Sequence, residues 1–165
     1  MCKWLLSILF ICCMMTGCTK SDSGLVAYKA QAAKDDQIVQ EYIKANGLTD
    51  VAHKVSDTCG VYYIVKNPGV GANIYTSSTL VTVGDTAKLL TTGEVFYQTS
   101  NFHPSYQLGS VILGWYLGIP KVQKGGIVRL LVPSRYAYGP YPQKDYNLPA
   151  NAILDFDIQV YNITN

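Results

Sequence analysis

Hydrophobic spacing divides this chain into a helical segment and a longer segment of strands. Between Val26 and Ala45, apolar residues recur at steps of three and four, which predicts a helix with one apolar face that ends near Gly47. After Asp50 the apolar runs become short and are separated by turn-forming residues, which is typical of strands. We predict strands at 60–65, 79–90, 94–100, 106–108, 127–132 and 153–163, and a short helix at 111–117.

The last strand shows the clearest alternation, and it defines two faces of the predicted sheet. Its polar face carries two aspartates, which we interpret as a solvated strand face rather than as a glycosidase or metal site, since no histidine cluster or partner carboxylate accompanies them. One face is formed by Leu154, Phe156, Ile158 and Val160, and the other by Asp155, Asp157, Gln159 and Tyr161. The predicted fold class is α+β, with a curved antiparallel sheet wrapped around one short helix and an N-terminal helical extension.

The N-terminal end is predicted to be a targeting segment. Lys3 gives it a positive start, and the apolar run from Trp4 to Met15 is shorter than the ~20 residues that span a bilayer. The segment Met15-Thr16-Gly17-Cys18 resembles the lipobox of bacterial lipoproteins, which implies lipidation of Cys18. An uncleaved signal anchor is the alternative. We therefore expect a signal peptide at 1–17, a lipidated cysteine with a flexible tether at 18–24, a helix at 25–50 and a folded domain at 58–165.

This targeting prediction has two consequences, one for the expected location of the protein and one for its cysteines. Lipidation implies a protein of the cell envelope, anchored in the outer membrane of a Gram-negative bacterium, facing either the periplasm or the surface. Loss of the leader would leave Cys59 as the only thiol not lipidated, so the domain is expected to lack an internal disulfide. We expect Cys59 to be a small, partly buried apolar residue, with an intermolecular disulfide as the alternative.

Charge and motif content exclude several classes of function. Without the leader the chain has twelve basic and eleven acidic residues, so its net charge of +1 gives no electrostatic footprint for nucleic acid. The two histidines, His53 and His103, have no neighbouring ligands at metal spacing, and no Gly-x-Ser-x-Gly elbow is present. We therefore expect no metal, no cofactor, no nucleic-acid partner and no serine hydrolase chemistry.

The segment from Val111 to Asp157 is the most specific part of the sequence. It contains a Val-Ile-x-Gly-Trp turn at 111–115, a Gly-Gly turn at 125–126, an Ala-Tyr-Gly loop at 137–139 and the alternating last strand. Together these features resemble the ligand-binding half of the FKBP-type peptidyl-prolyl isomerases. The resemblance extends over about 61–163 and implies an FKBP-like fold with a pocket for proline.

The resemblance also implies which residues form this pocket. Trp115 would be its floor, and the backbone of Val111 and Ile112 would bind a substrate or drug carbonyl. The remaining implied pocket residues are Phe96, Tyr106, Tyr138, Leu148 and Phe156. The loop at 140–147 is rich in proline and tyrosine, and it is either a contact for the polypeptide around the proline or an exposed loop without a target.

The N-terminal half of the resembling region departs from the bacterial pattern at two pocket positions. Asp85 stands where the family has a tyrosine, Tyr97 stands where it has an aspartate, and Thr91 or Thr92 is inserted between them. An exchange of the two residues could preserve a hydrogen-bonded pair in reverse, or it could alter the polar corner of the pocket. Both residues are therefore expected in the substrate-binding set.

Three functions follow from these patterns. The first is a peptidyl-prolyl cis-trans isomerase that acts on X-Pro bonds of exported polypeptides and binds the macrolide inhibitors of the family. The second is a binding or chaperone module with weak or no catalysis, which Asp85 and Tyr97 favour. The third is a lipoprotein component of a surface complex. The N-terminal helix is expected either to cover the domain of a monomer or to pair with a second copy in a dimer.

Overall fold

A computed structural model describes residues 20–165 of the chain, with side chains from Ser23 onward. The signal peptide and Cys18 predicted from the sequence lie outside these residues. The elements are α1 (Lys20–Ala45), β1 (His53–Lys54), β2 (Tyr62–Asn67), β3 (Leu80–Leu89), β4 (Val95–Gln98), β5 (Ser105–Gln107), α2 (Leu113–Gly118), β6 (Ile127–Val132) and β7 (Leu154–Thr164).

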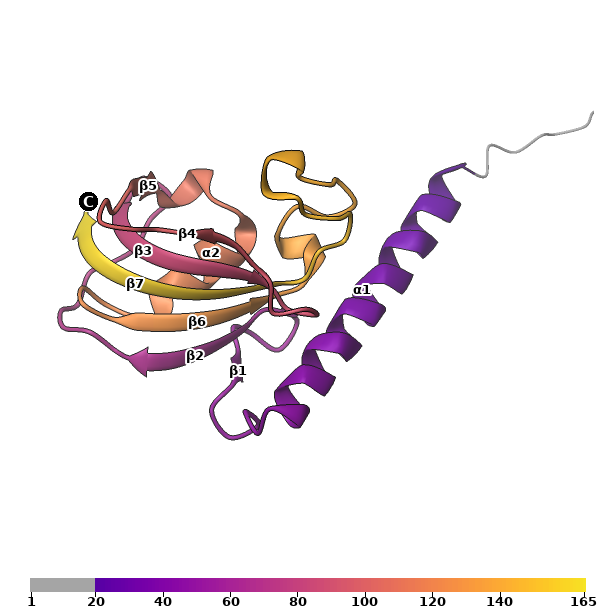
Figure 1. Cartoon of the computed structure of the whole chain (residues 1–165), viewed down its shortest axis with the longest axis horizontal. Helices are drawn as coiled ribbons and strands as arrows, with labels where there is room; N and C mark the ends of the chain where they lie inside the picture. The colour runs from indigo at the N-terminus through magenta and orange to yellow at the C-terminus, as the bar shows by residue number, and fades with distance from the viewer. Residues whose placement is uncertain (1–19) are drawn as a thin grey trace, which may run out of the picture.

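The strands form one antiparallel sheet that curves around α2, with α1 across one end (Figure 1). The strand order is β1-β2-β6-β7-β3-β4, and β5 pairs with the first residues of β3. Strand β7 therefore lies between β6 and β3, and it pairs with both along most of its length. The predicted α+β fold class, with its curved sheet, short helix and N-terminal helix, is confirmed.

Alternation along β3 and β7 builds the core between the sheet and α2. On β7 the side chains of Leu154, Phe156, Ile158 and Val160 are buried, as the sequence predicts. On β3 the buried positions are Val81, Val83, Asp85, Ala87 and Leu89. Cys59 is also buried in this core as a free thiol, which confirms the expectation of a small apolar role.

Glycines let α2 approach the sheet closely. A Cβ atom at Gly114 would lie 2.5 Å from Val132 Cγ1, and one at Gly118 would lie 2.4 Å from Leu130 Cδ2. Both glycines therefore face β6, where a larger side chain would push the helix outward. The helix begins at Leu113, two residues later than predicted, because Ile112 has an extended ψ of 149° and its carbonyl accepts the N–H groups of Trp115 and Tyr116.

The helix α1 begins at Lys20, whereas the sequence predicted a flexible tether up to Gly24. Residues 20–24 continue the helix, since Gly24 costs only about 1 kcal/mol relative to alanine within a helix. The second half of α1 packs on the domain through Val39 and Ile43, which form a second apolar cluster with Leu90, Leu131 and Ile153. The first half exposes Leu25, Val26 and Tyr28, so the helix-mediated dimer stays a prediction.

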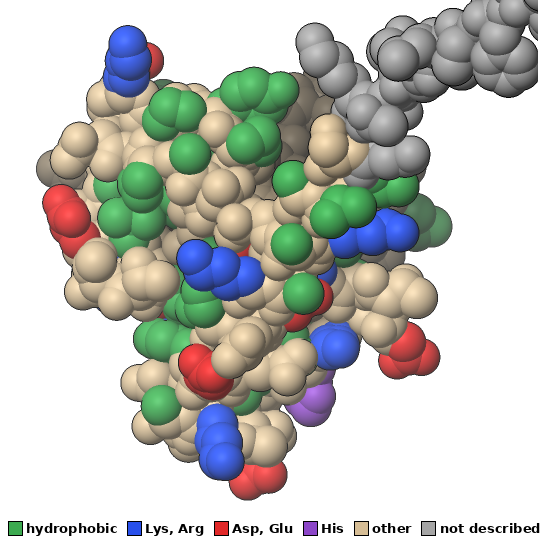
Figure 2. Space-filling view, turned by 90° about the vertical axis from the view of Figure 1, so that its right-hand side faces the viewer, with side chains coloured by type: hydrophobic (Ala, Val, Ile, Leu, Met, Phe, Trp, Pro, Cys, Tyr) green, Lys and Arg blue, Asp and Glu red, His purple; other side chains and the backbone are tan. Residues whose placement is uncertain are grey.

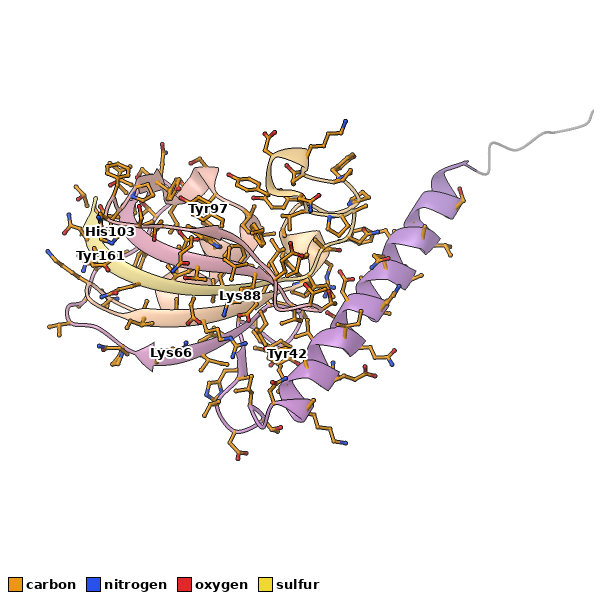
Figure 3. The ribbon with its side chains drawn as sticks, viewed as in Figure 1. Tyr42, Lys66, Lys88, Tyr97, His103 and Tyr161 are labelled. Atoms are coloured by element: carbon orange, nitrogen blue, oxygen red, sulfur yellow. The ribbon has the colours of Figure 1, made fainter. Side chains whose placement is uncertain are left out.

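Polar contacts join α1 to the sheet and correct the prediction for Asp155. Arg129 on β6 donates to both carboxylate oxygens of Asp155 at 2.8 Å, and it also donates to the Tyr42 hydroxyl of α1 at 2.7 Å. Asp155 is therefore buried, because α1 and Arg129 cover its end of the sheet. Of the two aspartates, Asp157 is the one that remains partly exposed, and it pairs with Lys66. Figure 3 shows Tyr42 on the side of α1 that faces the sheet.

Figure 2 looks at the side of the molecule where α1 lies, and basic and acidic side chains are interspersed on this face. Within residues 20–165, no helix has the length and apolar content that a membrane crossing needs. The same residues contain no cluster of three or more potential metal ligands.

Candidate functional site: an aromatic pocket beside the short helix

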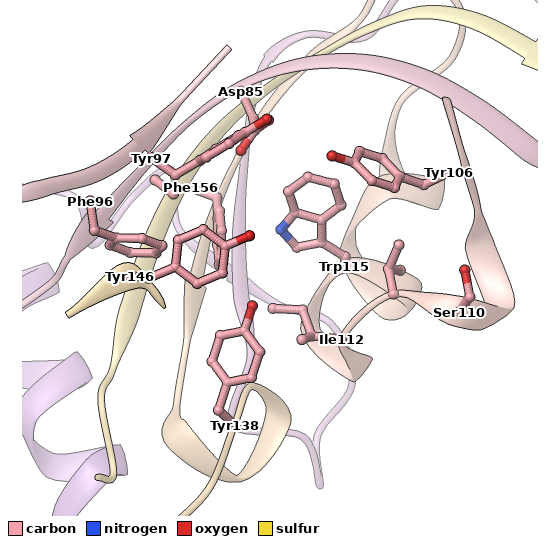
Figure 4. Close-up of a pocket in the computed structure, with 12 residues that line it drawn as sticks. Asp85, Phe96, Tyr97, Tyr106, Ser110, Ile112, Trp115, Tyr138, Tyr146 and Phe156 are labelled. Carbon is pink, nitrogen blue, oxygen red and sulfur yellow. The ribbon is translucent and has the colours of Figure 1, made fainter. Parts of the chain in front are cut away.

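A cavity of about 290 Å³ opens between α2, the inner face of the sheet and the loop after β6. Seven aromatic side chains form most of its wall, and the close-up in Figure 4 shows how they surround one space. The lining residues are Asp85, Ala87, Phe96, Tyr97, Tyr106, Ser110, Val111, Ile112, Trp115, Tyr138, Tyr146 and Phe156.

The floor of the cavity is Trp115, whose indole is held by two neighbouring rings. Its ring centroid lies 5.4 Å from that of Phe156 and 5.9 Å from that of Tyr106, and both contacts are edge-to-face. Such contacts between aromatic rings add about 0.5–1.5 kcal/mol beyond the area they bury. The indole is therefore fixed in one orientation, and only 7% of the residue is exposed.

A second group of edge-to-face contacts forms the wall next to this floor. Phe96 lies between Phe156 and Tyr146, with centroid distances of 6.4 Å and 6.0 Å, and Tyr146 in turn lies 6.2 Å from Tyr97. These residues come from β4, β7 and the loop between β6 and β7. The wall therefore depends on the folded sheet and the long loop together.

Four tyrosine hydroxyls point into the cavity (Figure 4). Burial raises the pKa of Tyr106 to about 12, with further contributions from the phenol of Tyr97 and the charge of Asp85. Burial also raises the pKa of Tyr138, with a smaller contribution from Tyr146. Both phenols therefore stay protonated near neutral pH and can donate hydrogen bonds to carbonyl groups of a ligand.

The carboxyl group of Asp85 gives the cavity its anionic corner. Strand β3 points this side chain inward, and two hydrogen bonds between the Asp85 backbone and Thr99 fix its position at 2.8 Å and 2.9 Å. Burial raises the pKa of Asp85 to about 6. Among the residues whose side chains are described, no hydrogen bond joins Asp85 to Tyr97, so the reversed pair considered from the sequence is not formed.

The entrance beside α2 offers a backbone donor. Val111 and Ile112 are extended and precede the helix, and both line the cavity. No backbone carbonyl within residues 20–165 accepts a hydrogen bond from the N–H of Ile112. This N–H group is therefore available to a carbonyl that enters the cavity.

The structure brings nine of the ten pocket residues expected from the sequence into the cavity wall, and Leu148 is the exception. Leu148 is buried in the core, and its backbone pairs with Gln143 to close the loop at 143–148. Sequence reasoning missed Ala87, Ser110 and Tyr146. No local sequence signal placed Tyr146 in the wall, because the chain turns there only in the folded loop, where Asn147 has a left-handed φ of 51°.

Neither of the two histidines lines this cavity. His103 and Tyr161 lie at one end of the sheet (Figure 3), and their ring centroids are 3.9 Å apart. His53 is exposed on β1, where its ring lies 5.7 Å from that of Tyr63. Neither residue can act as a proton donor or acceptor in the pocket.

Comparison with known proteins gives one consistent result. Residues 71–161 match the profile of the family described as FKBP-type peptidyl-prolyl cis-trans isomerase. The FK506-binding protein 1 of Saccharomyces cerevisiae is 36% identical over 103 residues, which cover 59% of this chain and 87% of the yeast protein. The FKBP-type peptidyl-prolyl cis-trans isomerase FkpA of Buchnera aphidicola subsp. Schizaphis graminum is 27% identical over 136 residues.

Coverage differs between these relatives. The match to the Buchnera protein covers 82% of this chain but 53% of that protein, so the chain spans about half of its length. The crystal structure of FkpA from Escherichia coli superposes with a TM-score of 0.67 and 26% identity, over 87% of this chain and 66% of that one.

Proposed function

Because the chain belongs to the family of FKBP-type peptidyl-prolyl cis-trans isomerases, we propose that it accelerates cis-trans isomerisation of X-Pro bonds in polypeptides and so assists their folding. One observation carries this proposal. The cavity has a buried indole as its floor, aromatic rings as its wall and a free backbone donor at its entrance.

The chemistry requires no covalent step. Rotation about an X-Pro bond is slow because the C–N bond has partial double-bond character, with a barrier of about 18–20 kcal/mol. Water stabilises the planar, polar amide, so a cavity that excludes water favours the twisted form in which conjugation is lost. Groups that bind the twisted amide more tightly than the planar one lower the barrier.

Individual residues have distinct roles in this mechanism. The prolyl ring would lie on Trp115, between Phe96 and Phe156. The N–H of Ile112 and the hydroxyl of Tyr138 would hold the carbonyl groups on either side of the bond, which fixes the segment while the amide rotates. The macrolide inhibitors of the family are proposed to occupy the same cavity.

Replacement of Trp115 tests this function. Trp115→Ala removes the floor, and we expect kcat/KM for a short X-Pro peptide to fall at least tenfold and macrolide binding to be lost. Trp115→Phe keeps a smaller ring and should retain part of the activity. Tyr116→Ala is the matched control, because Tyr116 lies on the same helix, is partly exposed and does not line the cavity. Full turnover by a folded Trp115→Ala variant would refute the pocket assignment.

We also propose that the mature protein is a lipid-anchored component of the cell envelope, acting on exported polypeptides. The support is the sequence Met15-Thr16-Gly17-Cys18, which lies outside the described residues. The mass of the protein purified from membranes tests this proposal, since lipidation adds acyl chains to a chain that begins at Cys18. The Cys18→Ser variant should lack them and leave the membrane fraction.

A further inference from the structure

The carboxyl group of Asp85 is buried without a partner. Only 5% of the residue is exposed, and its Oδ1 atom has no hydrogen-bond partner within the described part of the chain. The three ion pairs found in that part join Lys66 with Asp157, Arg129 with Asp155, and Arg135 with Asp36. Asp85 therefore has no cation of its own, which is costly for a buried carboxylate.

The position of this carboxylate within the cavity is equally informative. It lies beside Tyr97 and across from the indole of Trp115, and Tyr106 is on the neighbouring wall (Figure 4). Faces of tryptophan and tyrosine attract cations through their ring quadrupoles. A carboxylate among such rings offers a site that suits an ammonium or guanidinium group.

Two buried polar atoms of the cavity residues lack hydrogen-bond partners, so a ligand that fits the cavity should supply a donor and an acceptor. Oδ1 of Asp85 is an acceptor when ionised, and Nε1 of Trp115 is a donor that also has no partner among the described residues. A polypeptide segment supplies both, because its carbonyl groups accept and a basic side chain donates. A ligand with only apolar side chains would leave Asp85 buried and uncompensated.

We propose that Asp85 makes this pocket selective for X-Pro segments in which the residue next to the proline is lysine or arginine. This inference rests on the proposed isomerase function and names the substrate class of the same pocket. The prolyl ring lies on Trp115 in this arrangement, and the basic side chain extends along the aromatic wall to Asp85.

Protonation of Asp85 supplies an independent readout. Burial raises its pKa to about 6, so the carboxyl is mostly ionised at pH 7.5 and mostly neutral at pH 5. The titratable groups facing it are the phenols of Tyr97, Tyr106 and Tyr146, while α2 and β7 present the uncharged Trp115 and Phe156. His103 packs against Gly84, the residue before Asp85, so the effect of pH is judged from the ratio of kcat/KM for two substrates rather than from the rate with one.

The experiment compares four peptides that differ only beside the proline. Lysine or leucine is placed directly before or directly after it, and kcat/KM is measured for the purified protein at pH 7.5 and pH 5. Binding is followed separately by Trp115 fluorescence. Asp85→Asn keeps the size and removes the charge, Asp85→Glu keeps the charge, and Asp157→Asn removes one negative charge from the outer face of the sheet.

We expect the lysine-to-leucine ratio of kcat/KM to fall at least fivefold in Asp85→Asn and to fall similarly in the wild type between pH 7.5 and pH 5. Asp85→Glu should restore part of the preference, and Asp157→Asn should leave it unchanged. An equal ratio in the wild type and Asp85→Asn would overturn the inference while leaving isomerisation established. Absence of turnover with all four peptides would refute the proposed function, and a preference in binding alone would then still support the role of Asp85.

Discussion

Asp85 occupies an inward position of β3 between Val83 and Ala87, where the alternation of the strand calls for an apolar residue. Its neighbours on that face are buried in the core, and the carboxyl group reaches the cavity that they leave open. A buried carboxylate without a counter-ion lowers stability. Asp85 is therefore expected to destabilise the folded protein while it contributes to ligand binding in the pocket.

This cost can be measured as a dependence of stability on pH. The folded-state pKa of about 6 lies above the ordinary value of 3.8, so the folded protein holds this proton more tightly than the unfolded chain. The resulting stabilisation is complete below about pH 4 and is lost as pH rises through 6. Asp85→Asn should therefore raise the free energy of unfolding at pH 7.5 by about 1–3 kcal/mol relative to the wild type.

Urea unfolding at pH 7.5 and pH 4 measures this difference. The gain from Asp85→Asn should shrink toward zero at pH 4, where the wild-type carboxyl is neutral. Asp157→Asn is the control, because its exposed pair with Lys66 contributes within about 1 kcal/mol. A gain that is the same at both pH values would contradict the prediction.

At the scale of elements, α1 does more than cover the end of the sheet. Its Asp35 is fully buried and accepts hydrogen bonds from the N–H of Ser134 at 2.9 Å and from the Ser134 hydroxyl at 2.6 Å. The carbonyl of Ser134 in turn accepts the N–H groups of Ala137 and Gly139, on both sides of Tyr138. The helix therefore holds the turn that places Tyr138 in the cavity.

Removal of the Asp35 side chain should affect both stability and binding. Asp35→Ala leaves the N–H and hydroxyl of Ser134 buried without an acceptor, which is expected to lower the free energy of unfolding by about 2–4 kcal/mol. Macrolide affinity should also fall, because Tyr138 loses its support. Gln37→Ala is the control on the same helix, since its side chain bonds only Glu41 on the exposed face. Unchanged affinity in Asp35→Ala would show that the turn keeps its shape without α1.

The contact between α2 and β6 gives a second prediction at this scale. Gly114→Ala brings a Cβ to within 3 Å of both methyl groups of Val132, so α2 must shift away from the sheet and carry Trp115 with it. We expect a loss of about 1–3 kcal/mol in stability and a change in Trp115 fluorescence. Gly24→Ala on α1 meets nothing within 4 Å and should be neutral or stabilising by up to about 1 kcal/mol. Equal effects of the two changes would contradict this account.

At the scale of the whole molecule, local sequence patterns predicted where the strands lie better than they predicted the contacts between distant segments. Periodicity located β3, β6 and β7, because each alternates or runs apolar over its full length. It gave the wrong environment for Asp155, since exposure there depends on Arg129 and on α1, which lies more than a hundred residues away in the chain. The spacing of apolar and polar residues along one strand cannot reveal contacts with such distant segments.

The residues of the candidate site also differ in whether the sequence alone could predict them. Trp115, Phe156 and Tyr138 could be predicted because they match the motifs through which the sequence resembles the family. Tyr146 could not, because only the folded loop brings it against Phe96 and Tyr97. The sequence showed that Asp85 and Tyr97 differ from the family pattern. That the Asp85 carboxylate has no hydrogen-bond partner became clear only from its burial and its neighbours in the structure.

The central place of β7 in the sheet has a consequence for the order of folding. Strand β7 separates β6 from β3, so the two halves of the sheet share no pairing until residues 154–164 are in place. A chain that emerges from the ribosome N-terminus first therefore cannot close its core until residues 154–164 have been synthesised. The rate of this closure depends on pairings between distant residues, which are slow to form. The residues that precede β7 can therefore stay without a closed core until β7 has been synthesised.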